Sequence, residues 1–244
     1  MKNKGKLIIA GLIIINCFPG SLCAQSMEES SKALTLKQKS FIPIAAYTAT
    51  GDLQNLKMAH YEGFDAGLTI NEIKELTVHL YAYCGFPRSI RGLQTFMEVL
   101  DERQAKGIID ETGAEASPVN DEHSKYDRGK KNLEKLLGRP ITGPQRGYAA
   151  FAPVIEIFLK EHLFADIFDR DILTFAEREL VTVSVLSSIG GVEPMLRSHL
   201  AICLNVGYSP EQLTEFVGII QSRIGKKEAK AAQAVLDEVL GNEQ

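Results

Sequence analysis

Three polar residues, Glu75, His79 and Tyr83, follow one another at intervals of four in a stretch with helical periodicity. Residues four apart lie on one face of an α-helix, so a carboxylate, an imidazole and a phenol would stack along one line. A carboxylate beside an imidazole can move a proton, and a buried tyrosine hydroxyl can orient a substrate oxygen. The alternative is a solvated helix face with a modest ion pair. We take Glu75 and His79 as candidate catalytic residues and Tyr83 as a candidate substrate-binding residue.

A second pair of candidate catalytic residues, Arg197 and His199, lies in the segment LRSHL. An arginine can hold an anionic group, and a histidine can donate a proton or stabilise developing negative charge. The structural alternatives are a surface ion pair for Arg197 and a core histidine for His199.

Three further candidates, Glu72, Cys84 and Arg88, each have a strong structural alternative. Glu72 stands three residues after Thr69 and therefore also completes a capping box. For Glu72 and Cys84 to act together, their side chains would have to be close in space. A straight helix rises about 18 Å between them, so this would require a bend in the helix or a contact made through other elements. Cys84 continues an apolar stripe, and a nucleophilic role would require an acidified thiol. Arg88 follows the Phe86-Pro87 break and either lines the same cavity as a substrate-binding residue or caps a helix.

The chain carries one pattern twice. The segments that begin at Leu34 and Leu173 correspond with one residue of slip, and the matched residues are Thr35 and Thr174, Gly51 and Gly190, Leu56 and Leu196, Gly67 and Gly207, and Glu75 and Glu215. Two copies of a helical unit usually bury their apolar faces on each other, so a site between them can draw on both. The copies differ at the candidate positions, where Gln212, Ile219, Arg223 and Ile224 stand against Glu72, His79, Tyr83 and Cys84.

Periodicity predicts helices almost throughout, and no convincing strand alternation occurs. Capping boxes mark helix starts at Thr35, Thr69, Thr174 and Ser209. Further helices are expected from about Pro87 to Gln104, over Lys125–Leu137, over Phe151–Phe168 and from about Lys227 to Leu240. Residues 107–124 are polar and contain helix breakers, which is typical of a surface linker. The sequence therefore predicts an all-α protein.

Composition excludes some functions. The net charge of −4 over 244 residues, without a long basic run, argues against nucleic acid as a partner. No phosphate-binding loop, dinucleotide fingerprint or nucleophile elbow is present. His79 and Cys84 lack two further ligands at usable spacing, so we expect no metal and no cofactor.

The N-terminus has the pattern of an export signal. Lys2, Lys4 and Lys6 precede the apolar run Leu7–Phe18, which is too short for a stable membrane span. We expect cleavage after Ala24, with lipidation at Cys23 as the alternative, and export to a bacterial periplasm or cell envelope. The mature chain then holds Cys84 and Cys203, for which two free thiols are favoured over one disulfide.

Longer stretches resemble the carboxymuconolactone decarboxylase family. They are EIKELTVHLYAYCGFPRSIRGLQTFMEVL in the first copy, and KYDRGKKNLEKLLG, FLKEHLFADIFDRDILTFAERELVTVSVLSSIGG and LRSHLAICLNVG in the second. The resemblance covers about residues 34–103 and 126–240. It implies tandem alkylhydroperoxidase D-like helical repeats packed as one pseudo-symmetric unit. The expected organisation is a signal peptide (1–24), repeat 1 (27–106), a linker (107–124) and repeat 2 (125–244).

The resemblance also implies a class of activity. The expected protein is a cofactor-free decarboxylase or related lyase that acts on a small carboxylated lactone or acid and forms a homo-oligomer, with a trimer favoured. The peroxidase branch of the family uses a Cys-x-x-Cys pair, a glutamate twelve residues upstream and a histidine just downstream. Glu72 and Cys84 keep that spacing, but Pro87 replaces the second cysteine and Arg91 the histidine. A dithiol cycle needs a resolving thiol, which this sequence lacks at that position. A thiol peroxidase is therefore the second hypothesis, after the lyase. A non-catalytic envelope binding module is the third.

Overall fold

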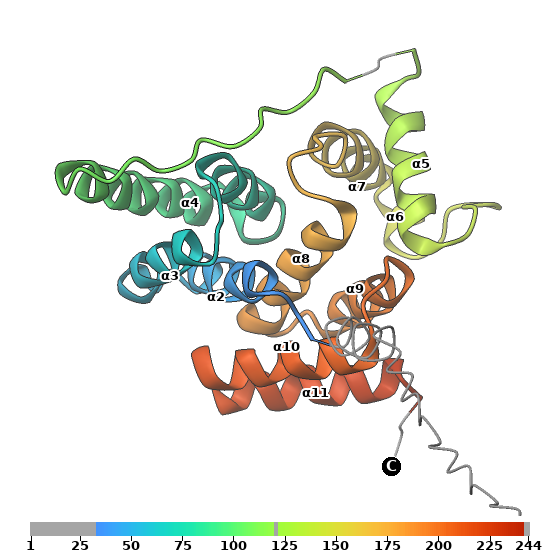
Figure 1. Cartoon of the computed structure of the whole chain (residues 1–244). Helices are drawn as coiled ribbons and strands as arrows, with labels where there is room; N and C mark the ends of the chain where they lie inside the picture. The colour runs from blue at the N-terminus through green and yellow to red at the C-terminus, as the bar shows by residue number, and fades with distance from the viewer. Residues whose placement is uncertain (1–32, 120–121, 242–244) are drawn as a thin grey trace, which may run out of the picture.

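The computed structural model describes residues 33–119 and 122–241, and these residues are helical or irregular, without a β-strand. The predicted signal peptide, with Cys17 and Cys23, lies outside them. The helices are α2 (Leu36–Thr50), α3 (Leu53–Asp65), α4 (Ile70–Ala105), α5 (Lys125–Leu137), α6 (Tyr148–Phe151), α7 (Pro153–Phe158), the π-helix η1 (Leu159–Ile167), α8 (Phe175–Ile189), α9 (Glu193–Asn205), α10 (Pro210–Arg223) and α11 (Lys226–Val239). The all-α prediction is confirmed (Figure 1). No helix in this part of the chain combines the length and the apolar character needed to cross a membrane.

The predicted capping boxes set the starts of α2, α4, α8 and α10. At α4, for example, the backbone N–H of Glu72 donates to the Thr69 hydroxyl, and the Glu72 carboxylate accepts from the Thr69 N–H at 2.9 Å. Gly67 has a φ of 86°, a left-handed conformation that lets the chain turn sharply before α4 begins. Short local signals therefore fix where these helices begin.

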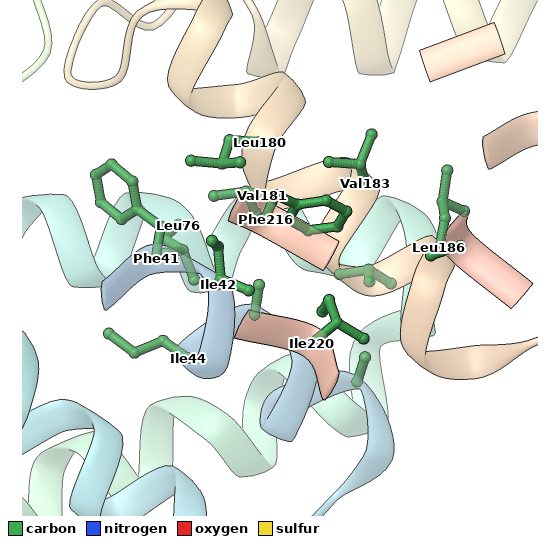
Figure 2. Close-up of a cluster of buried hydrophobic side chains, with 14 of the residues drawn as sticks. Phe41, Ile42, Ile44, Leu76, Leu180, Val181, Val183, Leu186, Phe216 and Ile220 are labelled. Atoms are coloured by element: carbon green, nitrogen blue, oxygen red, sulfur yellow. The ribbon is translucent and has the colours of Figure 1, made fainter. Parts of the chain in front are cut away.

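Helices α2 and α8 form the centre of the molecule and pack on each other. Each has ten consecutive buried residues, Ser40–Ala49 and Arg178–Ser187, so neither keeps a solvated face. Helices α3 and α4 cover α2, while α9 and α11 cover α8. Figure 2 shows the shared core, to which α2, α4, α8 and α10 contribute side chains such as Phe41, Leu76, Val181 and Phe216. The polar groups of α8 between Arg178 and Ser187 therefore lie in the interior.

Helix α4 is broken at Gly85, as the sequence predicts. Gly85 has φ 80° and ψ 159°, which separates a first segment carrying Glu75, His79 and Tyr83 from a second that begins near Pro87. The second segment packs Phe96 and Val99 into the core. The break therefore lets one continuous stretch of chain serve two different faces of the bundle.

Hydrogen bonds hold residues 111–117, part of the predicted linker, against the rest of the chain. The N–H of Ile70 donates to the Glu111 carbonyl at 3.0 Å, and the N–H of Asn71 donates to the Thr112 carbonyl at 2.9 Å. These bonds satisfy donors that the first turn of α4 leaves open. Farther on, the N–H of Ser117 donates to the Asp171 carboxylate at 2.8 Å. Figure 1 shows this segment running along α4 towards α5.

The helix expected over Phe151–Phe168 is not continuous, and this prediction is corrected. Pro153 lacks an N–H and disfavours helical geometry at Ala152, whose φ and ψ are −131° and 76°. The chain then restarts as α7 and widens into η1. Against η1 lies α5, and a Cβ on Gly129 would come within 1.8 Å of the Lys160 carbonyl oxygen. Glycine is therefore required at this helix crossing.

Candidate active site

Helices α4 and α8 meet at a buried ion pair between Glu75 and Arg178. The Glu75 carboxylate accepts from Arg178 Nη2 at 2.6 Å and from Arg170 Nε at 2.9 Å. The Arg178 side chain is fully buried, whereas Arg170 is 41% exposed. Burial lowers the pKa of the Arg178 guanidinium, and the hydrogen bond from Glu75 acts in the opposite direction. The expected Glu75–His79 pair does not form, because two guanidinium groups engage the carboxylate.

His79 lies one turn along α4 and contacts α8 through Thr182. His79 Nε2 is 2.9 Å from the Thr182 hydroxyl, which itself donates to the Arg178 carbonyl at 2.9 Å. Because the Thr182 hydroxyl uses its proton in the bond to the Arg178 carbonyl, it accepts from His79 Nε2. His79 Nδ1 then carries a lone pair. Nδ1 is buried and has no partner in the described part of the chain. Burial, with Arg178 and His199 nearby, lowers the pKa of His79 well below its usual value, so this imidazole is neutral.

Tyr83 links His79 to His199 of α9. Its ring centroid lies 5.2 Å from that of His79 and 5.9 Å from that of His199, the latter in an edge-on arrangement. The Tyr83 hydroxyl is buried and lies beside the Thr182 side chain. Burial raises the pKa of this phenol, so it stays protonated and can donate. The predicted residues Glu75, His79, Tyr83 and His199 therefore belong to one buried cluster.

His199 forms a short polar contact with Glu179 of α8. His199 Nδ1 lies 2.7 Å from Glu179 Oε2, and the Glu179 side chain is fully buried while His199 retains 14% exposure. A carboxylate on Nδ1 holds the proton there and leaves Nε2 for chemistry. The second Glu179 oxygen, Oε1, is buried without a partner among residues 33–119 and 122–241. This arrangement is that of a general acid–base pair.

Sequence reasoning missed Arg178 and Glu179. They stand together at the start of an otherwise apolar run, ERELVTVSVL, on a helix with no solvated face. Charged side chains are rarely buried unless they are paired, so adjacent charges inside an apolar helix were an available signal. Nε and Nη1 of Arg178 are also buried without partners in the described part of the chain. Buried polar groups normally have partners, so this concentration of open donors and acceptors indicates a place for a polar ligand.

Three predicted residues lie outside the cluster. Arg197 pairs with Glu238 of α11 at the surface, with a 52% exposed side chain. Glu72 caps α4 and pairs with Lys37 at 2.5 Å. The guanidinium of Arg88 packs against the turn after α2, where a Cβ on Gly51 would lie 1.5 Å from Arg88 Nη1.

Cys84 and Cys203 are both free, as expected. Burial raises the pKa of the Cys84 thiol, although Ser89 and Arg88 act in the opposite direction, and the thiol donates to the Leu80 carbonyl at 3.2 Å. Burial also raises the pKa of Cys203, well above its usual value. Neither thiol therefore has the acidified character that a nucleophile requires. Within the described residues, no group of three His, Cys, Asp or Glu side chains is placed to hold a metal ion.

Comparison with known proteins points to the half of the chain that holds the His199–Glu179 pair. Residues 155–238 match the sequence profile of the carboxymuconolactone decarboxylase family. This part of the chain is similar to carboxymuconolactone decarboxylase domains. The 4-carboxymuconolactone decarboxylase of Acinetobacter baylyi is 27% identical over 122 residues, which is 50% of this chain and 90% of that protein. The matched region includes Arg178, Glu179 and His199, whereas Glu75, His79 and Tyr83 enter the cluster from outside it.

Proposed function

We propose that this protein is a cofactor-free carboxy-lyase, or a related lyase, whose substrate is a small carboxylated lactone or acid. The observation that carries the proposal is the 2.7 Å contact between His199 Nδ1 and the buried Glu179 carboxylate. The family match over residues 155–238 supports the reaction class. The chemistry would occur in the buried cluster between α4, α8 and α9.

Each group of the cluster has a chemical role in such a reaction. The bond between the substrate carbon and its carboxylate breaks, carbon dioxide leaves, and the electron pair remains on carbon and spreads into the adjacent carbonyl. The open Nε and Nη1 donors of Arg178 and the Tyr83 hydroxyl would stabilise that negative charge. Protonated His199 would then deliver a proton from Nε2 to carbon, while Glu179 stabilises the imidazolium before transfer.

Glu75 and Arg170 would act through Arg178. Arg178 Nη2 donates to the Glu75 carboxylate and to the Arg170 carbonyl oxygen, each at 2.6 Å, which leaves the other end of the guanidinium open. Without Glu75 the arginine would be an uncompensated buried charge. We therefore assign Glu75 as a positioning residue rather than a proton carrier.

The thiol peroxidase alternative has less support. It requires an acidified Cys84, whereas burial raises the pKa of this thiol. A non-catalytic binding module would also place a ligand in the cluster, and activity measurement separates it from a lyase.

We further propose that the mature protein acts in the periplasm or cell envelope as a homo-oligomer, with a trimer favoured. The basic and apolar pattern of residues 1–24 supports export. The correspondence between residues 27–106 and 125–244 supports two related repeats joined by the linker 107–124. The Lys39–Glu215 and Arg178–Glu75 ion pairs, at matching positions, agree with that arrangement.

The direct test is carbon dioxide release from carboxymuconolactone by the protein starting at residue 25. His199→Ala and Glu179→Gln should each lower the rate by about 10²- to 10⁴-fold, the usual contribution of a positioned acid or base. Arg197→Ala is the matched control, because Arg197 lies on the same helix but pairs at the surface. An unchanged rate in His199→Ala would remove the proposed pair. Absence of release by the unaltered protein would remove the named reaction and favour the binding module.

A further inference from the structure

A cavity lies between α2, α3 and α10, outside the buried cluster. Its volume is about 440 Å³, within the range of small-molecule sites. Apolar side chains from these elements line it, namely Leu36, Pro43, Ala66 and Ile219. A ligand could bury an apolar body against this surface.

The cavity corresponds in sequence to the buried cluster. The offset that matches Thr35 with Thr174 also matches Lys39 with Arg178, and Glu215 is the counterpart of Glu75. The Lys39–Glu215 pair at 2.5 Å therefore repeats the Arg178–Glu75 pair at 2.6 Å. Likewise Ile219 and Arg223, which line the cavity, are the counterparts of His79 and Tyr83.

At two positions that line the cavity, the side chain is smaller or less polar than its counterpart in the buried cluster. Ser40 stands where the second copy has Glu179, and Pro43 stands where it has Thr182. Both line the cavity, and the Ser40 hydroxyl donates back to the Lys37 carbonyl. The acid–base pair of the buried cluster therefore has no equivalent here, and this cavity is suited to binding rather than to proton transfer.

Two cations, Lys39 and Arg223, and two carboxylates, Glu62 and Asp65, line the cavity. Lys39 is matched by Glu215, and Arg223 is matched by Glu62. Asp65, which also lines the cavity, is exposed and has no ion-pair partner within 4 Å among the described residues. Arg103 interacts electrostatically with Asp65 but forms its hydrogen bonds with Asp110, at 2.6 Å for the shortest.

We propose that this cavity binds a small amphipathic amine. The apolar body would lie against Leu36, Pro43 and Ile219, and the ammonium group would lie beside Asp65. An anion would instead have to compete with carboxylates that already hold both cations. This site is independent of the proposed lyase reaction, since none of its residues belongs to the buried cluster.

Three probes with one apolar body and different charges test the proposal: 3-phenylpropylamine, 3-phenylpropan-1-ol and 3-phenylpropionate. Each is titrated into the ¹⁵N-labelled chain from residue 25, and amide shifts in α2, α3 and α10 locate the site. The amine should bind about two- to fivefold more tightly than the alcohol, the ratio that one exposed ion pair provides, and the carboxylate should bind most weakly.

Two variants separate the contribution of the Asp65 charge to probe affinity from that of the cavity's shape. Asp65→Asn should remove the preference for the amine while leaving the alcohol's affinity unchanged. Ala66→Leu should fill the cavity and weaken all three probes, and Ala105→Leu, at an exposed alanine near the end of α4, is its control. Equal affinities in the unaltered protein, a preference for the carboxylate, or shifts confined to other helices would each overturn the proposal.

Discussion

Acid should destabilise this protein through His60, a core histidine without a polar partner. The His60 side chain is fully buried on α3, neither ring nitrogen has a hydrogen-bond partner in the described part of the chain, and its ring lies 4.9 Å from that of Phe96. Burial lowers the pKa of His60 from 6.5 to about 3. The folded state therefore keeps this imidazole neutral at pH values where the unfolded chain protonates it.

The direction of the effect follows from proton linkage. Below pH 6.5 the unfolded state binds a proton that the folded state refuses, so the free energy of unfolding falls as pH falls. Between pH 8 and pH 5 the loss from His60 alone is about 2 kcal/mol, because 1.5 pH units lie below the unfolded pKa at about 1.4 kcal/mol each. This figure is insensitive to the folded pKa so long as that pKa stays below 4.

Urea unfolding of the unaltered protein and of His60→Leu, each at pH 8 and pH 5, measures this term. The variant should lose about 2 kcal/mol less than the unaltered protein between the two pH values, since every other titrating group is common to both. His123→Gln, which alters an exposed histidine, should keep the original pH dependence. Equal losses in His60→Leu and the unaltered protein would show that His60 is protonated or solvated in the folded state, and the reasoning would fail.

Other predictions concern α4 and its partners. Glu75→Gln should lower the free energy of unfolding by about 3–5 kcal/mol, measured by urea unfolding, because it leaves the buried Arg178 without a carboxylate; a loss below 1 kcal/mol would contradict a buried pair. Cys84 of the folded protein should react with iodoacetamide at pH 7.5 more slowly than Cys84 of the protein unfolded in urea, because burial raises the pKa of the thiol. Mass spectrometry of the labelled peptide measures both rates, and an equal or faster rate in the folded protein would contradict the prediction. Gly85→Ala should lower the melting temperature, because alanine is strained at a φ of 80°, and an unchanged melting temperature would mean that the break relaxes at no cost.

Helix positions could be predicted from the sequence because their signals are local. Each capping box involves residues three apart, so Thr35, Thr69, Thr174 and Ser209 mark helix starts without knowledge of the tertiary structure. The interruption before Pro153 had an equally local cause in the proline itself. It was overlooked because the apolar pattern of the segment continues across the break.

The candidate site could be predicted only in part, since it depends on contacts between distant segments. The i, i+4 spacing correctly grouped Glu75, His79 and Tyr83 on one side of α4, but the partner of Glu75 lies 103 residues away on α8. Arg197 and His199 were treated as a pair, yet residues two apart point to different sides of a helix. His199 accordingly turns to Glu179 in the interior, while Arg197 turns to the surface.

The Glu75–Arg178 contact joins the two halves of the chain, and this limits how the protein could be divided. A fragment ending near residue 106 would contain Glu75 without its partner Arg178, and a fragment beginning near residue 125 would contain Arg178 without Glu75. Each fragment would have to hydrate or neutralise its charge and give up packing around it. The halves should consequently be poor folders when produced separately and should recover structure when mixed. A substitution at either residue would then need a compensating change in the opposite half, so the two segments would be expected to diversify in concert.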